Sequence, residues 1–347
     1  MLALLGACAG QKGGSAGDSS VGTAPVVAVA SDSTGTKLVM VGGGIWTSTD
    51  GGVTWNARAA SGLPHIQQWT SVASDATGTN LVAVVNGFYD RPEANPAAFS
   101  GDVWTSTDSG ATWTDRTASS SAHGQAWRSV ASDASGTNLV AVTAGLGVLG
   151  PGAIWTSTDA GTTWANTTAV DAGAGSQSWS SVASDATGKN LVAVGSGSGI
   201  WASIDGGLIW TDRTPGDSKF QASFGNQMEG WSSVASDATG AKLVAAVDTG
   251  DIWTSTNGGV TWSDVGPASS WQVWFSVASD STGTNLIAVD GLVNGNDGEI
   301  WTSTNGGLSW TDQTTGNPAA SGFWEAVASN AAGDHLVAIG QGAIWIN

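Results

Sequence analysis

The stretch Ser48-Thr49-Asp50-Gly51-Gly52-Val53-Thr54-Trp55 decides the fold of this 347-residue chain. It has the form S-x-D-x-G-x-T-W, and looser copies follow along the sequence. The other copies of this repeat phrase are centred on Asp108, Asp159, Asp205, Asn257 and Asn305. A phrase of this length does not recur six times by chance, so the chain is an array of one supersecondary unit.

The repeat phrase belongs to a longer unit that reads W-x-S-V-A-S-D-x-T-G-x-x-L-V-A-V, a variable stretch, and I-W-T-S-T-D-G-G-x-T-W. Its V-A-S-D/N element occurs seven times at intervals of 43 to 58 residues, close to the roughly 40–50 residues of a propeller blade. Four short runs in each unit have β-strand composition and are bounded by turn residues: W-x-S-V-A-S, L-V-A-V, I-W-T-S and x-T-W-x-D. We predict an all-β, seven-bladed β-propeller of four-stranded blades. The alternative, a β-solenoid, expects shorter and more regular rungs.

Tryptophan usage supports this repeat. Of 20 tryptophans, 19 occupy one of three repeat positions, at the start of the first run, in the third run or at the end of the repeat phrase. A buried aromatic side chain removes about 150–250 Å² from water, or roughly 4–6 kcal/mol of gross stabilisation. We expect these residues to form the core. Trp271 alone lies off the pattern.

The seventh unit is incomplete. It keeps Trp324, Val327, Leu336 and Trp345 and then reaches Asn347, where its repeat phrase would begin. Propellers often close by borrowing a strand from the other end of the chain. The donor would lie near residues 12–23, which are rich in Gly and Ser and are a poor strand. We therefore predict a last blade of three strands, or one closed by a weakly held N-terminal segment. An open edge there would invite pairing with another chain.

The repeat phrase resembles the Asp-box (BNR) repeat of sialidase-like propellers, over about residues 26–347. The resemblance implies that the phrase is the turn between strands three and four of a blade. Its aspartate would cap backbone amides, its glycine would take a positive φ, and its tryptophan would pack between blades. Asn257 and Asn305 can make the same local hydrogen bonds. Ile209 and Ser309 replace the threonine in two copies. The six Asp and Asn residues are therefore expected to be structural.

Composition limits the partners. The chain has 10 Lys and Arg against 28 Asp and Glu, a net charge of −18. This balance argues against nucleic acid and against attraction to anionic lipid. Many acidic residues stand in turn positions, among them Asp75 and Asp133, where turn capping is their simplest role. We expect no cofactor; the alternative is structural calcium bound by these carboxylates, although no calcium-loop motif supports it.

The single cysteine, Cys8, ends the stretch Leu5-Gly6-Ala7-Cys8, which resembles a bacterial lipobox. Only seven residues precede it, without a basic region. We predict a truncated lipoprotein-like signal over residues 1–8 with lipidation at Cys8, a Gly/Ser-rich tether over 9–24, and one propeller domain over 25–347. The alternative is a chance cysteine in a tail. This prediction places the protein on the cell envelope or outside the cell, with the membrane contacted only through the lipid.

The variable segments point to the functional face. The turns between runs one and two and within the repeat phrase lie at one end of every blade and hardly vary. The loops between runs two and three and the connections between blades lie at the other end, where function usually resides. A concave mouth with mixed aromatic, amide and carboxylate groups suits a carbohydrate or peptide; the alternative is loops that merely cover the channel. The predicted ligand-binding residues are Phe88, Tyr89, Asp90, Arg91, Glu93, Phe220, Phe224, Gln227, Glu229, Trp271, Asp297 and Glu299.

No catalytic residue is assigned. The resemblance to sialidases would require an arginine triad and a Tyr/Glu pair. However, Arg58, Arg116 and Arg213 fall on the outermost strand, and Tyr89 has no evident partner. We predict a non-catalytic binding or assembly propeller for a protein, peptide or glycan, similar to sortilin-type receptors and photosystem II assembly factors. One alternative is an extracellular glycoside hydrolase with paired carboxylates. Another is a surface protein that self-assembles through its incomplete blade.

Overall fold

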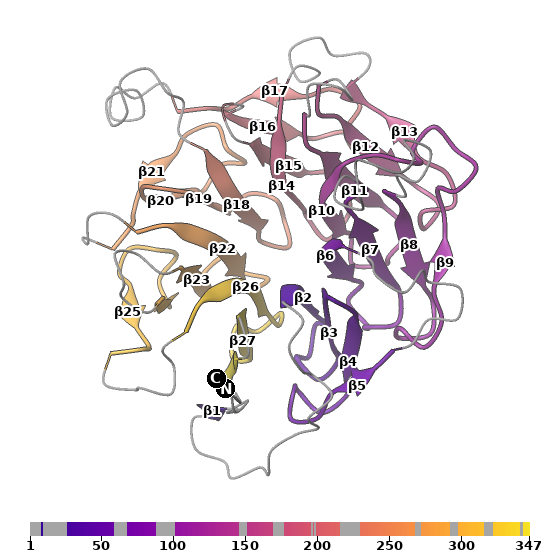
Figure 1. Ribbon diagram of the computed structural model, residues 1–347. Coiled ribbons are helices and arrows are strands. Elements are labelled where there is room, and N and C mark those ends of the chain that lie inside the picture. The colour runs from indigo at the N-terminus through magenta and orange to yellow at the C-terminus, as the bar shows by residue number, and fades with distance from the viewer. Residues whose placement is uncertain are drawn as a thin grey trace, which may run out of the picture.

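The computed structural model describes residues 8–9, 26–58, 68–87, 101–145, 151–168, 177–195, 197, 199–215, 230–267, 272–291, 298–315, 322–340 and 343–347. The described strands form seven sheets that stand around a common axis (Figure 1). The predicted all-β, seven-bladed propeller is confirmed, and the described residues contain no α-helix. None of these residues forms a helix that is long and apolar enough to cross a membrane.

Each blade is an antiparallel meander that runs outward from the axis. The innermost strands are β2 (Val26–Ser31), β6 (Trp69–Ser74), β10 (Trp127–Ser132), β14 (Trp179–Ser184), β18 (Trp231–Ser236), β22 (Trp274–Ser279) and β26 (Trp324–Ser329). The second strands are β3 (Leu38–Gly42), β7 (Leu81–Val85), β11 (Leu139–Thr143), β15 (Leu191–Gly195), β19 (Leu243–Val247), β23 (Leu286–Asp290) and β27 (Leu336–Gly340). The third strands are β4 (Ile45–Ser48), β8 (Val103–Ser106), β12 (Ile154–Ser157), β16 (Gly199–Ser203), β20 (Ile252–Ser255), β24 (Ile300–Ser303) and β28 (Ala343–Ile346).

Blades one to six each add a short fourth strand at the periphery. These strands are β5 (Asn56–Ala57), β9 (Thr114–Asp115), β13 (Ala165–Asn166), β17 (Thr211–Asp212), β21 (Ser263–Asp264) and β25 (Thr311–Asp312). The predicted fourth run x-T-W-x-D placed the tryptophan inside the strand, and this boundary is wrong. The tryptophan belongs to the turn, because only the two residues after it pair with the third strand, as Asn56 and Ala57 do with Thr47 and Trp46.

The hydrophobic core lies between the blades. All five residues of β3 are buried, since successive side chains of a strand point to opposite faces and both faces are covered. Leu38 and Met40 pack with Val337 and Ile339 of blade seven, whereas the intervening Val39 packs toward blade two. Continuous apolar second strands are thus the sequence signature of a sheet enclosed between two others.

The tryptophans fill these interfaces, as the sequence predicted. The six that begin inner strands are at most 3% exposed. Trp69 packs in one cluster with Val39 and Val41 of the preceding blade, and Trp104 and Trp113 of its own blade join the same cluster. Each interface therefore combines the tryptophans of one blade with the second and third strands of its neighbour.

The last blade has three antiparallel strands, β26, β27 and β28. The two-residue strand β1 (Cys8–Ala9) lies beside β28 and runs parallel to it, with Cys8 opposite Trp345. The donor segment expected at residues 12–23 lies outside the described residues, and the strand that does pair is nearer the N-terminus. A last blade of three strands with a weakly held N-terminal segment was one of the predicted forms.

A ring of backbone hydrogen bonds links all seven blades. In each blade the residue after the aspartate or asparagine of the first turn donates its N–H to the matching carbonyl of the next blade, at 3.0–3.1 Å. The donor–acceptor pairs are Ser33–Ala76, Ala76–Ala134, Ala134–Ala186, Ala186–Ala238, Ala238–Ser281, Ser281–Ala331 and Ala331–Ser33. The last pair closes the ring, and β2 also packs against β26. The ring is therefore complete within residues 26–347.

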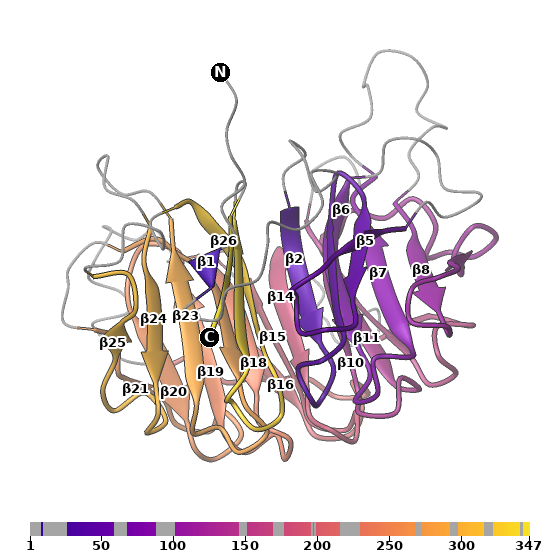
Figure 2. The same ribbon diagram turned by 90° about the horizontal axis from the view of Figure 1, so that it is seen from below.

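The two ends of the ring differ. The turns between first and second strands and the repeat phrases share one end, which we call the turn face; they form the lower edge of Figure 2. A hydrogen bond from Gly51 N to Thr36 O, at 2.9 Å, joins the two kinds of turn. The opposite end, which we call the loop face, carries the segments that join second to third strands and one blade to the next.

Candidate functional site

The repeat phrase builds a self-contained turn. Ser48 Oγ donates to Asp50 Oδ1 at 2.7 Å and accepts from Gly52 N at 2.8 Å. Asp50 also accepts from Thr54 N at 2.9 Å and from Thr54 Oγ1 at 2.6 Å. Gly52 has a φ of +87°, a conformation that favours glycine. The side chains of Ser48, Asp50 and Thr54 thus find their partners within the phrase, as expected for a structural element.

The asparagine copies keep this geometry with one reversal. Asn257 Oδ1 accepts from Ser255 Oγ and Thr261 N, but its Nδ2 donates to Thr261 Oγ1 at 2.9 Å. The threonine hydroxyl, which donates to an aspartate, here accepts from the amide. Asn305 donates in the same way to Ser309 Oγ at 2.8 Å. Because the hydroxyl of the threonine or serine can rotate and either donate or accept, Asp and Asn support the same turn.

Hydrogen bonds to the carboxylates lower the pKa of several aspartates in these turns. The side chain and backbone of Thr112 hold the pKa of Asp108 at about 2. The aspartates in the turns between first and second strands also accept local hydrogen bonds. Asp75, for example, accepts from Thr77 and Thr79 and from Asn80 Nδ2. The acids of the turn face therefore serve the fold. The described residues hold no cluster of three or more His, Cys, Asp or Glu side chains that could bind a metal.

The loop face contains the acids that depart from the repeat. Asp290 ends β23 at a position where the other blades have Gly, Val or Thr, and it is only 3% exposed. The backbone N–H of Glu299 donates to its carboxylate. Burial is the main cause that raises the pKa of Asp290 to about 7, and the nearby charge of Glu299 acts in the same direction. Near neutral pH a large share of Asp290 therefore keeps its proton.

Glu299 completes this group. It is half-buried immediately before β24, and its Oε2 accepts hydrogen bonds from Gln272 Nε2 and from Trp301 Nε1, both at 3.0 Å. Within the described residues its Oε1 makes no hydrogen bond. We call Asp290, Glu299, Gln272 and Trp301 the blade-six cluster. It holds one buried acid with a high pKa beside a carboxylate that is oriented by two donors.

A second acidic group stands at the boundary of blades two and three. Asp102, immediately before β8, is 4% exposed, and burial raises its pKa despite the opposing effect of a hydrogen bond with His123. Its Oδ1 lies 2.6 Å from His123 Nδ1 and accepts from Thr117 Oγ1 at 3.0 Å. The His123 side chain is 43% exposed. The pair therefore positions an imidazole whose other nitrogen, Nε2, makes no hydrogen bond in the described part of the chain.

Most predicted site residues cannot be compared with this geometry. Glu299 is described and belongs to the blade-six cluster. The others, Phe88, Tyr89, Asp90, Arg91, Glu93, Phe220, Phe224, Gln227, Glu229, Trp271 and Asp297, lie outside the described residues. Cys8 is described only as backbone in β1.

The sequence prediction missed Asp290, Asp102 and a further loop-face acid, Asp248, whose pKa burial also raises. A signal was present in each case. Asp290 ends a run that is otherwise apolar or glycine-terminated, and Asp102 precedes a third run as Glu299 does. Each is an acid at a repeat position that is not acidic in most copies.

Comparison with known proteins identifies the architecture. No protein-family model matches the sequence, and no curated protein does. Solved structures do match. The GH74 xyloglucanase from Xanthomonas campestris has a TM-score of 0.65 and 17% identity over 93% of this chain and 52% of its own. The GH74 enzyme from Niastella koreensis has a TM-score of 0.70 and 17% identity over 94% of this chain and 52% of its own.

YCF48 from Cyanidioschyzon merolae has a TM-score of 0.64 and 16% identity over 92% of this chain and 94% of its own. A structure of YCF48 bound to D1 peptide has a TM-score of 0.63 and 18% identity over 93% and 92%. This chain spans about half the length of the GH74 chains and nearly all of YCF48. At these identities the likeness shows the propeller fold alone.

Proposed function

We propose that this protein is a non-catalytic binding or assembly propeller that recognises a protein, peptide or glycan on its loop face. The observation that carries the proposal is the hydrogen bonding of the Glu299 carboxylate. One of its oxygens is fixed by Gln272 and Trp301, and the other makes no hydrogen bond in the described residues. A half-buried acceptor held in one orientation is what a hydroxyl or N–H of a ligand requires.

Burial of Asp290 favours binding over catalysis. A general acid must reach the atom that it protonates, within about 2.6–3.2 Å or through one water. Asp290 is 3% exposed and is engaged by the backbone of Glu299. Its protonated form lowers the negative charge beside Glu299, so its role in the proposal is to position Glu299. The structure of YCF48 with D1 peptide shows that a propeller of similar size binds a peptide, which supports this class of function.

The test is a screen of the full chain against peptide and glycan arrays, followed by calorimetric titration of the best hit. Glu299→Ala and His123→Ala are each expected to weaken binding about fivefold, since a hydrogen bond contributes about 0.5–1.5 kcal/mol. Lys189→Gln, an exposed change on the turn face, is the matched control and should bind as the wild type does. Binding that is unchanged in both loop-face variants would refute the proposal.

A second candidate, an extracellular glycoside hydrolase, is favoured by one specific observation. Glycosidases use a pair of carboxyl groups of which one has a raised pKa, and Asp290 beside Glu299 offers such a pair. The GH74 xyloglucanase of similar fold makes xyloglucan the first substrate to try. Release of reducing ends by the wild type, lost in both Asp290→Asn and Glu299→Gln and kept in Lys189→Gln, would establish the hydrolase. Glucan polymers left intact would exclude these substrates.

We also propose that the repeat phrase is an Asp-box and that Cys8 carries a lipid anchor on the cell envelope. The support for the first is the closed hydrogen-bond set of Ser48, Asp50 and Thr54. The support for the second is the small residues before Cys8. Mass spectrometry of the full chain from a bacterial host, compared with Cys8→Ser, tests the anchor. An unmodified Cys8 thiol would contradict it.

A further inference from the structure

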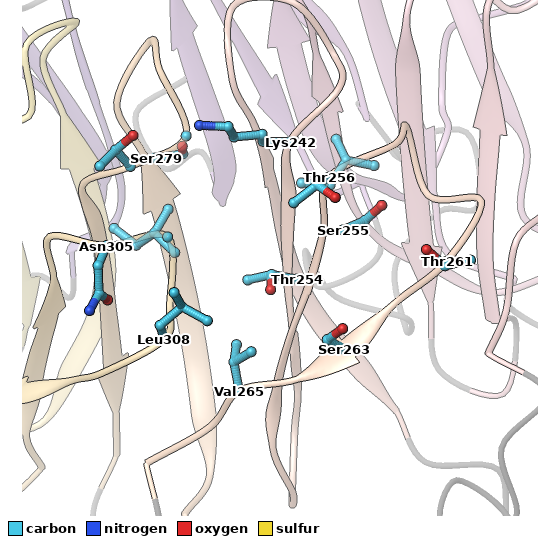
Figure 3. A pocket seen from close by; sticks show the side chains of 15 residues that line it. Lys242, Thr254, Ser255, Thr256, Thr261, Ser263, Val265, Ser279, Asn305 and Leu308 are labelled. Atoms are coloured by element: carbon cyan, nitrogen blue, oxygen red, sulfur yellow. The ribbon is translucent and has the colours of Figure 1, made fainter.

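A cavity lies between blades five and six at the turn face. Its volume is about 340 Å³, and Lys242, Thr254, Val265 and Leu308 are among its lining residues. Figure 3 shows the side chains of Thr254, Val265 and Leu308 around one open space. The matching site between blades one and two, lined by Lys37 and Thr47, the counterparts of Lys242 and Thr254, has only about 10 Å³. Equivalent positions of the repeat therefore enclose an open cavity between blades five and six and almost none between blades one and two.

The two sites differ at one arginine. Arg58 follows β5 and its Nε donates to Thr47 Oγ1, at 2.7 Å. Arg116 makes the same bond to Thr105 Oγ1 in blade two, also at 2.7 Å. Val265 occupies this position in blade five. Its backbone N–H donates to the first residue of the third strand at 2.9 Å, as those of Arg58 and Arg116 do at 2.8 and 2.9 Å. The backbone site is thus the same, but the guanidinium is absent.

The acceptor for that guanidinium is retained. Thr254 stands where Thr47 and Thr105 stand, and its hydroxyl makes no hydrogen bond within the described residues. In blade six, Gln313 Nε2 supplies the N–H to Thr302 Oγ1 at 2.7 Å. Blades one, two and six therefore satisfy the threonine of the third strand from their own chain. In blades three and five the matching residues, Thr156 and Thr254, make no side-chain hydrogen bond within the described residues, and the cavity lies beside Thr254.

We propose that this cavity binds an arginine side chain of a protein partner. The guanidinium Nε–H would donate to Thr254 Oγ1 as Arg58 donates to Thr47, and the aliphatic stem would lie along Val265 and the 81% exposed Leu308. The net charge of −18 attracts a cationic ligand. The Nζ of Lys242 donates to Thr282 O at 2.7 Å. A lysine at this position is compatible with a guanidinium on the threonine, since Lys37 lines the matching site where Arg58 binds Thr47.

The site is separate from the loop face, so the two proposals stand or fall independently. The probe is the tripeptide acetyl-Gly-Arg-Gly-amide, titrated into the ¹⁵N-labelled protein and followed by NMR. Peptides with lysine or citrulline in place of arginine test the charge and the shape of the guanidinium. We expect saturable shifts at Thr254 and Val265 for arginine, at least fivefold weaker binding for lysine and citrulline, and unchanged arginine binding in Glu299→Ala.

The chain supplies its own competitor. Val265→Arg should fill the cavity and form the bond to Thr254 that Arg58 forms to Thr47, and so weaken peptide binding at least tenfold without loss of fold. Val260→Arg, on the same blade, adds the same charge at a position that is 57% exposed and outside the cavity, and should bind within twofold of the wild type. Equal binding by folded Val265→Arg and the wild type, or equal affinity for lysine and arginine, would overturn the proposal.

A gain of function provides the second check. Arg58→Val should open the matching space between blades one and two, so that a folded variant binds two arginine peptides, with new shifts at Thr47. Thr254→Val, which keeps the shape of the side chain and removes the acceptor, should weaken binding at the original site at least threefold. A folded Arg58→Val protein that still binds one peptide, or a Thr254→Val protein with wild-type affinity, would contradict the assignment of the guanidinium to this site.

Discussion

The backbone N–H of Ala331 in blade seven donates to the carbonyl oxygen of Ser33 in blade one, at 3.1 Å. This is the same hydrogen bond that joins every other pair of neighbouring blades. The seam also contains a full hydrophobic cluster, in which Val26 and Trp46 pack with Ile339 of blade seven. The place where the two ends of the ring meet is therefore built like the other six interfaces.

The first prediction concerns this closure. Removal of residues 1–24 deletes β1, whose pairing with Trp345 and Ile346 is the only contribution of these residues in the described structure. The apparent Tm should change by less than about 3 °C, since the seam keeps its core and its backbone bond. Differential scanning calorimetry makes the measurement. A fall of ten degrees or more would mean that the N-terminal segment closes the ring.

Size-exclusion chromatography with light scattering on the same two proteins tests self-assembly. If the outer edge of β28 pairs with another copy once β1 is removed, the shortened protein should associate. A monomer in both forms, and also after removal of residues 340–347, would eliminate the self-assembling alternative.

The fold was predictable because the same sequence pattern occurs in seven units. Each unit repeats the buried inner tryptophan, the apolar second strand and the turn residues, so the blade is defined by averaging over its copies. The closing contact was not predictable, because Ala331 and Ser33 are about as far apart in sequence as the described ring allows. Their hydrogen bond joins two backbone groups, so it does not depend on which side chains stand at these positions and cannot be predicted from them.

Among the predicted ligand-binding residues, Glu299 is the one that the structure describes. The pKa of Asp290 depends on burial and on Glu299 and Gln272, which reach it from a loop and from the connection between blades. A buried carboxyl and an exposed one look alike in a sequence. The repeat did contain a usable signal, because Asp290 breaks the pattern of its strand, but only the structure shows that this break lies beside Glu299 and Trp301.

A second prediction concerns two strained turns. Ser109 and Ala160 have φ of +58° and +57° at a repeat position where the other copies have glycine. The left-handed conformation destabilises the folded state by about 1–2 kcal/mol for a non-glycine residue. Glycine avoids this cost, but its greater conformational entropy in the unfolded chain offsets about 0.5–1 kcal/mol of the gain. Ala160→Gly should therefore raise the free energy of unfolding by about 0.5–1 kcal/mol, measured by urea titration.

The matched control for this prediction is Gly258→Ala at the same position of blade five. Its φ is +66°, and an added Cβ would meet only Gly240 O at 3.6 Å, an ordinary contact. This variant should lose stability by a similar amount. Two changes of the same sign would show that packing, and not the backbone angle, controls stability at this position.

A third prediction tests the structural role of the repeat phrase. Asp159→Asn should be nearly neutral, within about 0.5 kcal/mol, because Asn257 and Asn305 support the same turn. Asp159→Ala should lower the free energy of unfolding by about 1–2 kcal/mol, since Thr163 N and Thr163 Oγ1 lose their acceptor. Urea titration of both variants makes the comparison. Loss of ligand binding by the folded Asn variant would instead give the residue a functional role.

The last prediction follows from the pKa of Asp290. The folded protein holds this proton up to about pH 7, whereas an unperturbed aspartate releases it near 3.8. Between these values the native state binds more protons than the unfolded state, so this residue's contribution to stability falls as the pH rises from about 4 to about 7 and is constant above. The fall is at most about 4 kcal/mol.

Asp290→Asn removes the titrating group and keeps an oxygen for the Glu299 N–H. The difference in unfolding free energy between variant and wild type, from urea titrations at pH 4, 5, 6, 7 and 8, should therefore grow in favour of the variant up to pH 7 and then stay level. A difference that is independent of pH would show that Asp290 has the same pKa in the folded and unfolded states, and the positioning role proposed for its proton beside Glu299 would fail with it.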